Sequence, residues 1–131
     1  MGVTEVGVVL DLNERPILWH LPEDRTLTSL PDSPDLWQFI WDNRDRISGI
    51  AHSHPWYGDA TPSHEDVTTF AAIERALGKR LRWWVVTFDR IMTVNWFGPG
   101  DLDYGCIAYG SNPEWVAEIR EKSKWNLTKQ D

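Results

Sequence analysis

Residues 46–66 read RISGIAHSHPWYGDATPSHED, and this stretch joins a predicted strand to the start of a predicted helix. Alternate side chains share a face in an extended strand, so His52 and His54 are expected to lie on the same face of a sheet. A loop rich in proline and glycine follows. Ser63 is then a favourable N-cap for a helix that we expect to end before Gly78.

Asp66 lies near the start of this helix, on the same stripe as the apolar side chains. Phe70, Ile73 and Leu77 follow it at spacings of four, three and four residues, which places the carboxylate on the buried side. Two imidazoles and an inward carboxylate can offer three ligand atoms to one point, and three protein ligands leave a fourth tetrahedral position open. The pattern therefore predicts a catalytic type of zinc site.

Each of these residues also has an ordinary structural explanation. Paired histidines occur in polar cores, and Ser63 with Asp66 can form a simple capping box. Burial of two histidines and an acid costs free energy unless something compensates their lost hydration. Taken together, the three residues favour a bound metal ion.

Composition narrows the possible classes of protein. The chain has 131 residues, enough for one domain, and 41% of them are hydrophobic and 25% charged, as in ordinary globular proteins. A net charge of -7 argues against partners such as nucleic acid or anionic lipid. No apolar run approaches the roughly 20 residues that cross a bilayer, and no signal peptide is evident, so we expect no membrane association and a cytoplasmic location.

Cysteine and tryptophan contents add two further expectations. Cys106 is the single cysteine, which excludes an internal disulfide and leaves histidine and carboxylate as the metal ligands. There are nine tryptophans. We expect some of them in the core and others on a surface that meets a ligand.

The remaining elements are predicted from apolar patterning and turn residues. We expect strands at 3–12, 16–21, 46–54, 82–88, 91–97 and 104–109, and helices at 34–43, at 63–77 and from residue 112 or 113 to about Trp125. We expect an α/β arrangement in which helices flank a mixed sheet. No linker or repeat divides the chain, so residues 1–131 are expected to form a single domain.

The spacing of the candidate ligands resembles that of a known family. Its motifs are His52-Ser53-His54-Pro55 and, after a loop, Ser63-His64-Glu65-Asp66. They are similar to the H-[ST]-H-P and S-x-x-D signature of the JAMM (MPN-plus) zinc isopeptidases, and Glu5, which we expect on the first strand, resembles the upstream acid of that family. The likeness covers nearly all of residues 3–97, and it implies the cytidine-deaminase-like JAB/MPN fold. That family has a helix ahead of the acid; here this helix is missing or the C-terminal helix replaces it.

The resemblance also implies an activity and a role for each residue. His52, His54 and Asp66 would bind Zn²⁺, Glu5 would be the general base, and Ser63 would help to stabilise the oxyanion. A zinc-bound water would then hydrolyse a peptide or isopeptide bond. Without room for long insertions, the chain resembles a minimal prokaryotic or phage-type member.

Several partners and functions remain open at this point. The implied substrate is a ubiquitin-like or sulfur-carrier-like protein with an extended C-terminal tail. A phage-tail or cell-wall peptidase would use the same zinc chemistry. The alternatives without catalysis are an MPN-type scaffold, which normally lacks one or more ligands, and a metal-free binding module rich in aromatic residues.

Other side chains are weaker candidates. Trp56 and Tyr57 follow the paired histidines, so they either form aromatic walls of a substrate groove or simply pack the loop. Glu14 is an alternative base, but it lies in a predicted hairpin turn. We expect a hydrogen-bonded structural role for His20, and His64 to face solvent or the rim of the cleft.

Overall fold

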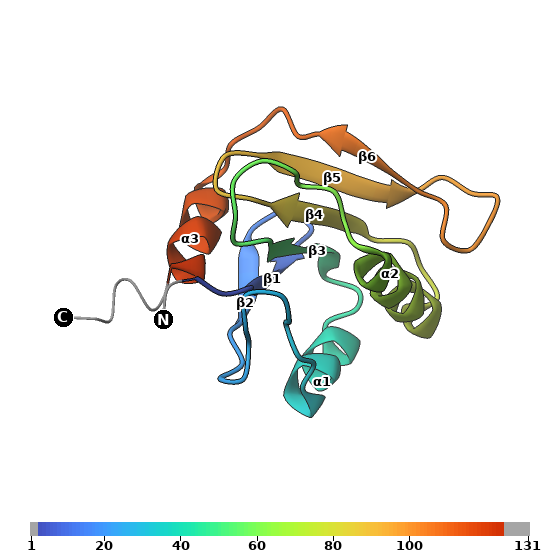
Figure 1. The fold of residues 1–131 in the computed structure, drawn as a ribbon. Coiled ribbons are helices and arrows are strands. Elements are labelled where there is room, and N and C mark those ends of the chain that lie inside the picture. Colours follow the sequence, from blue (N-terminus) through green and yellow to red (C-terminus); the bar gives the residue numbers. More distant parts are fainter. Residues whose placement is uncertain (1–2, 125–131) are drawn as a thin grey trace.

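The computed structural model describes residues 3–124, which form one six-stranded sheet with helices on both faces (Figure 1). The strands are β1 (Gly7–Asp11), β2 (Pro16–His20), β3 (Ile47–Ser53), β4 (Arg82–Val86), β5 (Ile91–Trp96) and β6 (Tyr104–Ala108). The helices are α1 (Pro34–Asp42), α2 (His64–Leu77) and α3 (Glu114–Ser123). This confirms the expected α/β class, a mixed sheet flanked by helices. Within the described range, each helix is too short or too polar to cross a membrane.

The first hairpin forms two strands, as expected, and the order of elements is ββαβαβββα. The start of the chain differs from the prediction, because β1 begins at Gly7 rather than at residue 3. The preceding segment bonds to other parts of the chain: the amide of Thr4 donates to the carbonyl of Ser123 and the amide of Glu5 to that of Thr26. Glu5 is therefore held just ahead of β1, and not on the first strand as expected, because its amide bonds to Thr26 rather than to a neighbouring strand. Trp125, the expected end of the last helix, lies outside the described residues.

The sheet order is β2-β1-β3-β4-β5-β6. Strands β3 and β4 run parallel, and the other neighbours are antiparallel. Parallel neighbours need a crossover connection, and α2 supplies it. As a result, the end of β3 and the beginning of α2 are joined by a single loop, residues 54–63.

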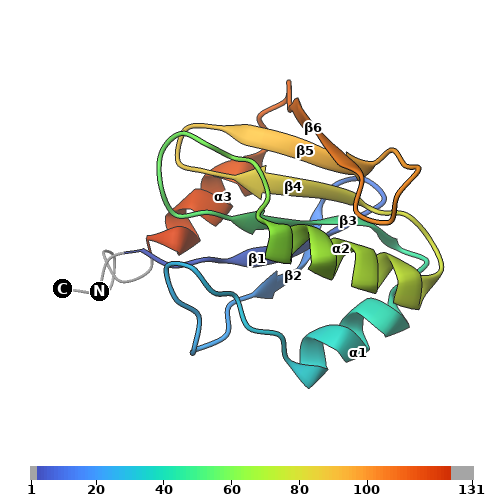
Figure 2. The ribbon, with the colours of Figure 1, turned by 45° about the vertical axis from the view of Figure 1, so that its right-hand side comes forward.

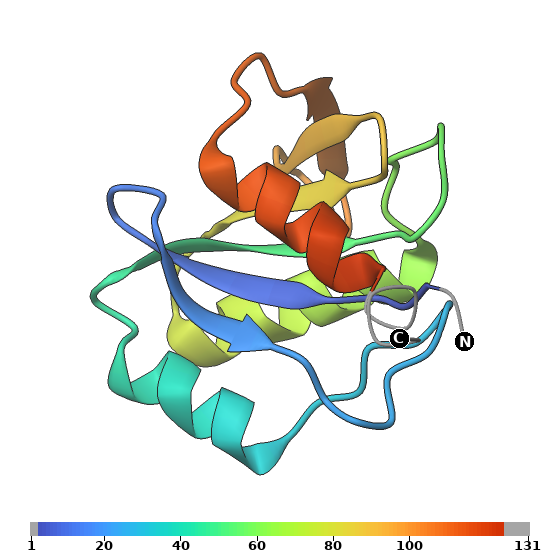
Figure 3. The ribbon, with the colours of Figure 1, turned by 90° about the vertical axis from the view of Figure 1, so that its left-hand side faces the viewer.

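Helices α1 and α2 lie on one face of the sheet, and α3 lies on the other (Figures 2 and 3). Side-chain alternation along the central strands builds a core on each face. On the α1/α2 face, Val9, Trp83 and Val85 pack with Ile40, Phe70 and Ile73. On the α3 face, Val8, Trp84 and Val86 pack with Trp115, Val116 and Ile119. The central strands are thus buried on both sides.

Two glycines meet specific backbone needs. A Cβ at Gly49 would lie 1.9 Å from the carbonyl oxygen of Arg82, so only glycine allows β3 and β4 to approach here. Gly78 ends α2 with φ of 70°, a left-handed conformation that favours glycine. The predicted end of this helix is confirmed.

Candidate metal centre

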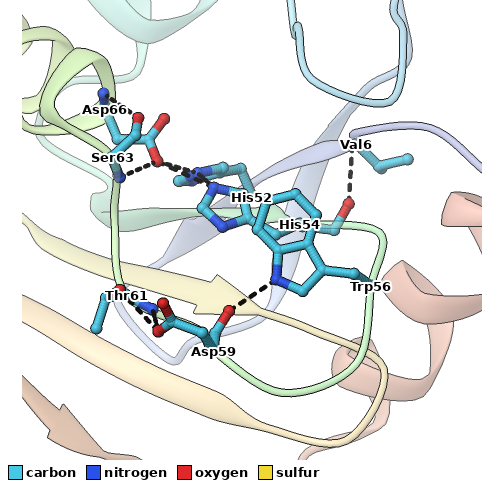
Figure 4. A network of polar contacts seen from close by, with 9 residues as sticks. Val6, His52, His54, Trp56, Asp59, Thr61, Ser63 and Asp66 are labelled. Carbon is cyan, nitrogen blue, oxygen red and sulfur yellow. Dashed lines mark hydrogen bonds and ion pairs between the residues drawn. The ribbon is translucent and has the colours of Figure 1, made fainter.

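The side chains of His52, His54 and Asp66 converge at one end of the sheet (Figure 4). Nε2 of His52 lies 3.1 Å from Nε2 of His54. The Asp66 Oδ2 atom lies 3.1 Å from the first of these nitrogens and 3.0 Å from the second. Three potential ligand atoms therefore form a nearly equilateral triangle.

This triangle has the dimensions of one face of a metal coordination sphere. Zinc bonds of about 2.0–2.1 Å in tetrahedral geometry separate neighbouring ligand atoms by about 3.3 Å. The observed separations are only slightly shorter. Two imidazole nitrogens and one carboxylate oxygen also match the ligands that zinc accepts. The donor set therefore fits a divalent metal ion.

His52 and His54 point to the same face because alternate side chains of a β-strand lie on one side of the sheet. Ser53, between them, points to the opposite face, where its Oγ accepts hydrogen bonds from the amide of Val6 and the hydroxyl of Ser123. The shared face of His52 and His54 that the sequence predicts is thus confirmed.

Asp66 is aimed at the histidines by the helix cap. Oγ of Ser63 accepts a hydrogen bond of 3.0 Å from the amide of Asp66, and the amide of Ser63 donates to Asp66 Oδ2 at 2.9 Å. The capping box that offered an ordinary explanation is present. It also holds the carboxylate beside the two histidines, so the capping and metal-ligand interpretations are compatible.

The electrostatic surroundings keep Asp66 ionised. Burial acts to raise the pKa of its carboxyl group, but hydrogen bonds with His52 and His54, together with the Ser63 amide, outweigh burial and hold that pKa well below its usual range. Asp66 is therefore a carboxylate at neutral pH, the form that binds a metal ion.

Trp56 covers one of the histidines. Its ring centroid lies 4.6 Å from that of His54, and its Nε1 donates a 2.8 Å hydrogen bond to the carbonyl of Asp59. Among the described residues, the buried Nδ1 of His54 has no hydrogen-bond partner. The orientation of this imidazole is thus set by packing against Trp56 and by the contacts of Nε2.

Tyr57 occupies a different position from Trp56. Trp56 lines the cleft that contains the three ligands, whereas Tyr57 is not among its lining residues and is 71% exposed. Its ring lies 5.3 Å from that of Phe88, on the segment between β4 and β5. The loop therefore turns one of its two aromatic residues toward the ligands and the other toward Phe88.

Glu5 lines the same cleft as the three ligands. It is 7% exposed, and this burial raises the pKa of its carboxyl group to about 7; the nearby His54 acts in the opposite direction. Its backbone is held by the carbonyl of Thr26, and its neighbours Thr4 and Val6 are held by Ser123 and Ser53. A buried acid is therefore fixed beside the candidate metal site.

The other candidates lie elsewhere or have structural partners. Glu14 lies in the turn between β1 and β2, where it pairs with Arg82 and accepts a hydrogen bond from Tyr109. Nε2 of His20 donates to the carbonyl of Pro31 at 2.6 Å. His64 is exposed at the first turn of α2.

Sequence reasoning missed part of the cleft. Thr69 and Phe70 line it from α2, and Leu30 lines it from the segment before α1. The position of Phe70, one helical turn after Asp66, was a signal that could have placed it there. Leu30 carried no such signal, because nothing in the local pattern relates it to the histidines.

A scan against models of protein families gives no match for the chain, and a search of curated proteins gives no significant match. The side chains of His52, His54 and Asp66 could hold a divalent cation in the cleft. The carboxyl group of Glu5 lies in the same cleft and can exchange a proton near neutral pH.

Proposed function

We propose that the chain is a zinc-dependent peptidase or isopeptidase of the JAMM type, with the JAB/MPN fold and with a ubiquitin-like or sulfur-carrier-like protein as substrate. The observation that carries this proposal is the convergence of His52 Nε2, His54 Nε2 and Asp66 Oδ2 within 3.0–3.1 Å in the cleft that also contains Glu5. The position of α3 adds support, since its last turn holds the segment that carries Glu5.

Each residue has a chemical task in this proposal. When bound, zinc supplies a Lewis acid that activates water and polarises the carbonyl of the scissile bond. His52, His54 and Asp66 hold the ion. Glu5 takes a proton from the attacking water and returns it to the departing amine, a task suited to a carboxyl group whose pKa is near neutrality.

Ser63 and Trp56 also have tasks in this proposal. The Ser63 Oγ accepts from the amide of Asp66, which leaves its hydroxyl proton free to donate to the developing oxyanion. Trp56 covers His54 and limits the access of bulk water to that ligand.

The test is the metal content of the protein purified without chelator, measured by elemental analysis. We expect about one zinc per chain in the wild type and its loss in His52→Ala. His64→Ala is the matched control, because it removes an exposed histidine of α2, and it should retain the metal. Zinc that persists in His52→Ala, or that is absent from all three proteins even after zinc is added, contradicts the proposal.

A zinc-loaded protein should then be tested for hydrolysis. Fusions that join a ubiquitin-like protein through its C-terminal tail to a second protein are suitable substrates, with cleavage followed by mass. A chain that holds zinc but cleaves none of these fusions, nor short peptides, would instead support a scaffold role.

A further inference from the structure

The cleft extends well beyond the metal ligands. It has a volume of about 470 Å³, within the range of about 300–1,000 Å³ that is typical of sites for organic ligands. One end is polar and contains the ligands and Glu5. Much of the remaining lining comes from α1, α2 and the strands beneath them, whose arrangement Figure 2 shows. Its apolar members include Leu30, Leu36, Ile50, Phe70, Ile73 and Trp83, and we call this part of the lining the apolar end.

The apolar wall begins directly beside the ligands. The ring of Phe70 lies 6.0 Å from that of His52, edge to face, and it stacks on Trp83 at 4.2 Å. Phe70 is buried, so the position of its ring is fixed by packing. A group held at the metal site therefore adjoins an apolar surface.

Other lining side chains keep apolar surface exposed. Leu30 and Leu36 are only half-buried, although both line the cleft. A Cβ at Gly7 would lie 3.2 Å from the Leu30 side chain, so the glycine keeps β1 clear of this wall. An apolar ligand would cover the exposed parts of both leucines, which favours its binding.

Charge disfavours an acidic occupant of the apolar end. The acidic side chains that line the cleft are Glu5, Asp32, Glu65 and Asp66, and its described lining residues include no lysine or arginine. Away from the metal ligands, no protein cation in this lining would offset the charge of an acidic side chain. An uncharged apolar side chain is therefore the favoured occupant.

We propose that this end of the cleft is a specificity subsite for a bulky apolar side chain, of the leucine or phenylalanine class, on a substrate residue that adjoins the scissile bond. This inference rests on the proposed function, because the hydrolytic site defines which bond is adjacent. A tail made only of glycine would leave the apolar wall in contact with water.

The experiment uses the zinc-loaded full chain and internally quenched hexaglycine peptides. One residue at a time, at each inner position, is replaced by leucine, phenylalanine or glutamate. We expect leucine or phenylalanine at one position next to the cleaved bond to raise kcat/KM at least about 10-fold over the glycine peptide, and glutamate to give no gain. Equal cleavage of all peptides overturns the subsite and leaves the hydrolytic function intact.

Two variants narrow the subsite from two different segments. Leu30→Trp fills it from the segment before α1, and Thr69→Trp fills it from α2. Each should reduce the preference for leucine over glycine to about 3-fold or less. The matched controls are Leu27→Trp and Ala72→Trp, which lie on the same segments, are exposed and do not line the cleft. Both controls should keep the preference.

Binding of the same peptides to chelator-treated protein, measured by calorimetry, separates the two proposals. Tighter binding of the leucine peptide, weakened by Leu30→Trp or Thr69→Trp, supports the subsite even if no peptide is cleaved; the proposed hydrolysis would then be wrong. Absence of both cleavage and side-chain preference overturns both proposals.

Discussion

Glu5 is an acid that the fold shields from water. Its pKa rises to about 7 because burial disfavours the ionised form, and the opposing attraction of His54 is smaller. The carboxyl group is thus close to the midpoint of its titration at neutral pH, unlike Asp66, which hydrogen bonds keep ionised. Two acids in one cleft are therefore suited to different tasks.

The raised pKa of Glu5 predicts a pH-dependent stability. Between about pH 4.5 and 7 the folded chain holds a proton that the unfolded chain releases, so the free energy of unfolding falls as pH rises through this range. In chelator-treated protein, Glu5→Gln should therefore stabilise the fold by about 1–3 kcal/mol at pH 8 and by little at pH 4. Thermal unfolding at both pH values measures this. A gain of equal size at both would contradict the titration of Glu5.

The same substitution should abolish turnover without removing the metal. Loss of a general base typically lowers kcat by about 10²- to 10⁴-fold, while the ligand set is unchanged. Glu14→Gln is the control, since Glu14 pairs with Arg82 away from the cleft, and it should keep full activity. Full peptidase activity in Glu5→Gln would show that another group is the base.

At the scale of elements, the first turn of α2 connects helix capping with ligand geometry. Ser63 and Asp66 exchange two hydrogen bonds, and the same Oδ2 atom that accepts from Ser63 faces both histidines. Loss of the Ser63 cap is therefore expected to shift the carboxylate of Asp66 relative to the two histidines.

Ser63→Ala tests this connection. It should cost about 1 kcal/mol in stability and also weaken zinc binding, measured by competition with a chromogenic chelator. Ser33→Ala is the matched control: Ser33 caps α1 by accepting from the amide of Leu36, so its loss should cost similar stability and leave zinc affinity unchanged. If Ser63→Ala and Ser33→Ala bind zinc with equal affinity, the cap at Ser63 does not position the Asp66 ligand, and this prediction is wrong.

At the scale of the whole molecule, metal binding depends on the complete fold. The ligands come from β3 and the start of α2, and Glu5 is held beside them by contacts with Thr26, Ser53 and α3. An unfolded chain does not preserve this arrangement, so an ion bound to the site stabilises the folded state.

Zinc at 100 times its dissociation constant should therefore raise the free energy of unfolding by about 2.7 kcal/mol. For a chain of this size, that corresponds to a rise in Tm of roughly 10 °C. Differential scanning fluorimetry with and without zinc measures the shift, and His52→Ala should abolish it. An equal shift in wild type and His52→Ala would place the binding elsewhere.

Much of the fold follows from local sequence patterns. The two-residue period determines that His52 and His54 share a face, and the helical period places Asp66 on the same stripe as Phe70. Ser63 and Gly78 mark the ends of α2 as the capping rules predict. These features depend on neighbours a few residues apart, so the amino-acid sequence by itself determined them.

Only the tertiary structure decided which distant segments meet. Leu30 approaches Gly7 through the course of the chain between β2 and α1, and Glu5 lies in the cleft because Ser53 and Ser123 hold its segment ahead of β1. Local periodicity defines the face on which a side chain lies, but not the register between segments far apart in sequence. That register is set by strand pairing and by burial on both faces of the sheet, and the spacing of 3.0–3.1 Å at the candidate metal site is its consequence.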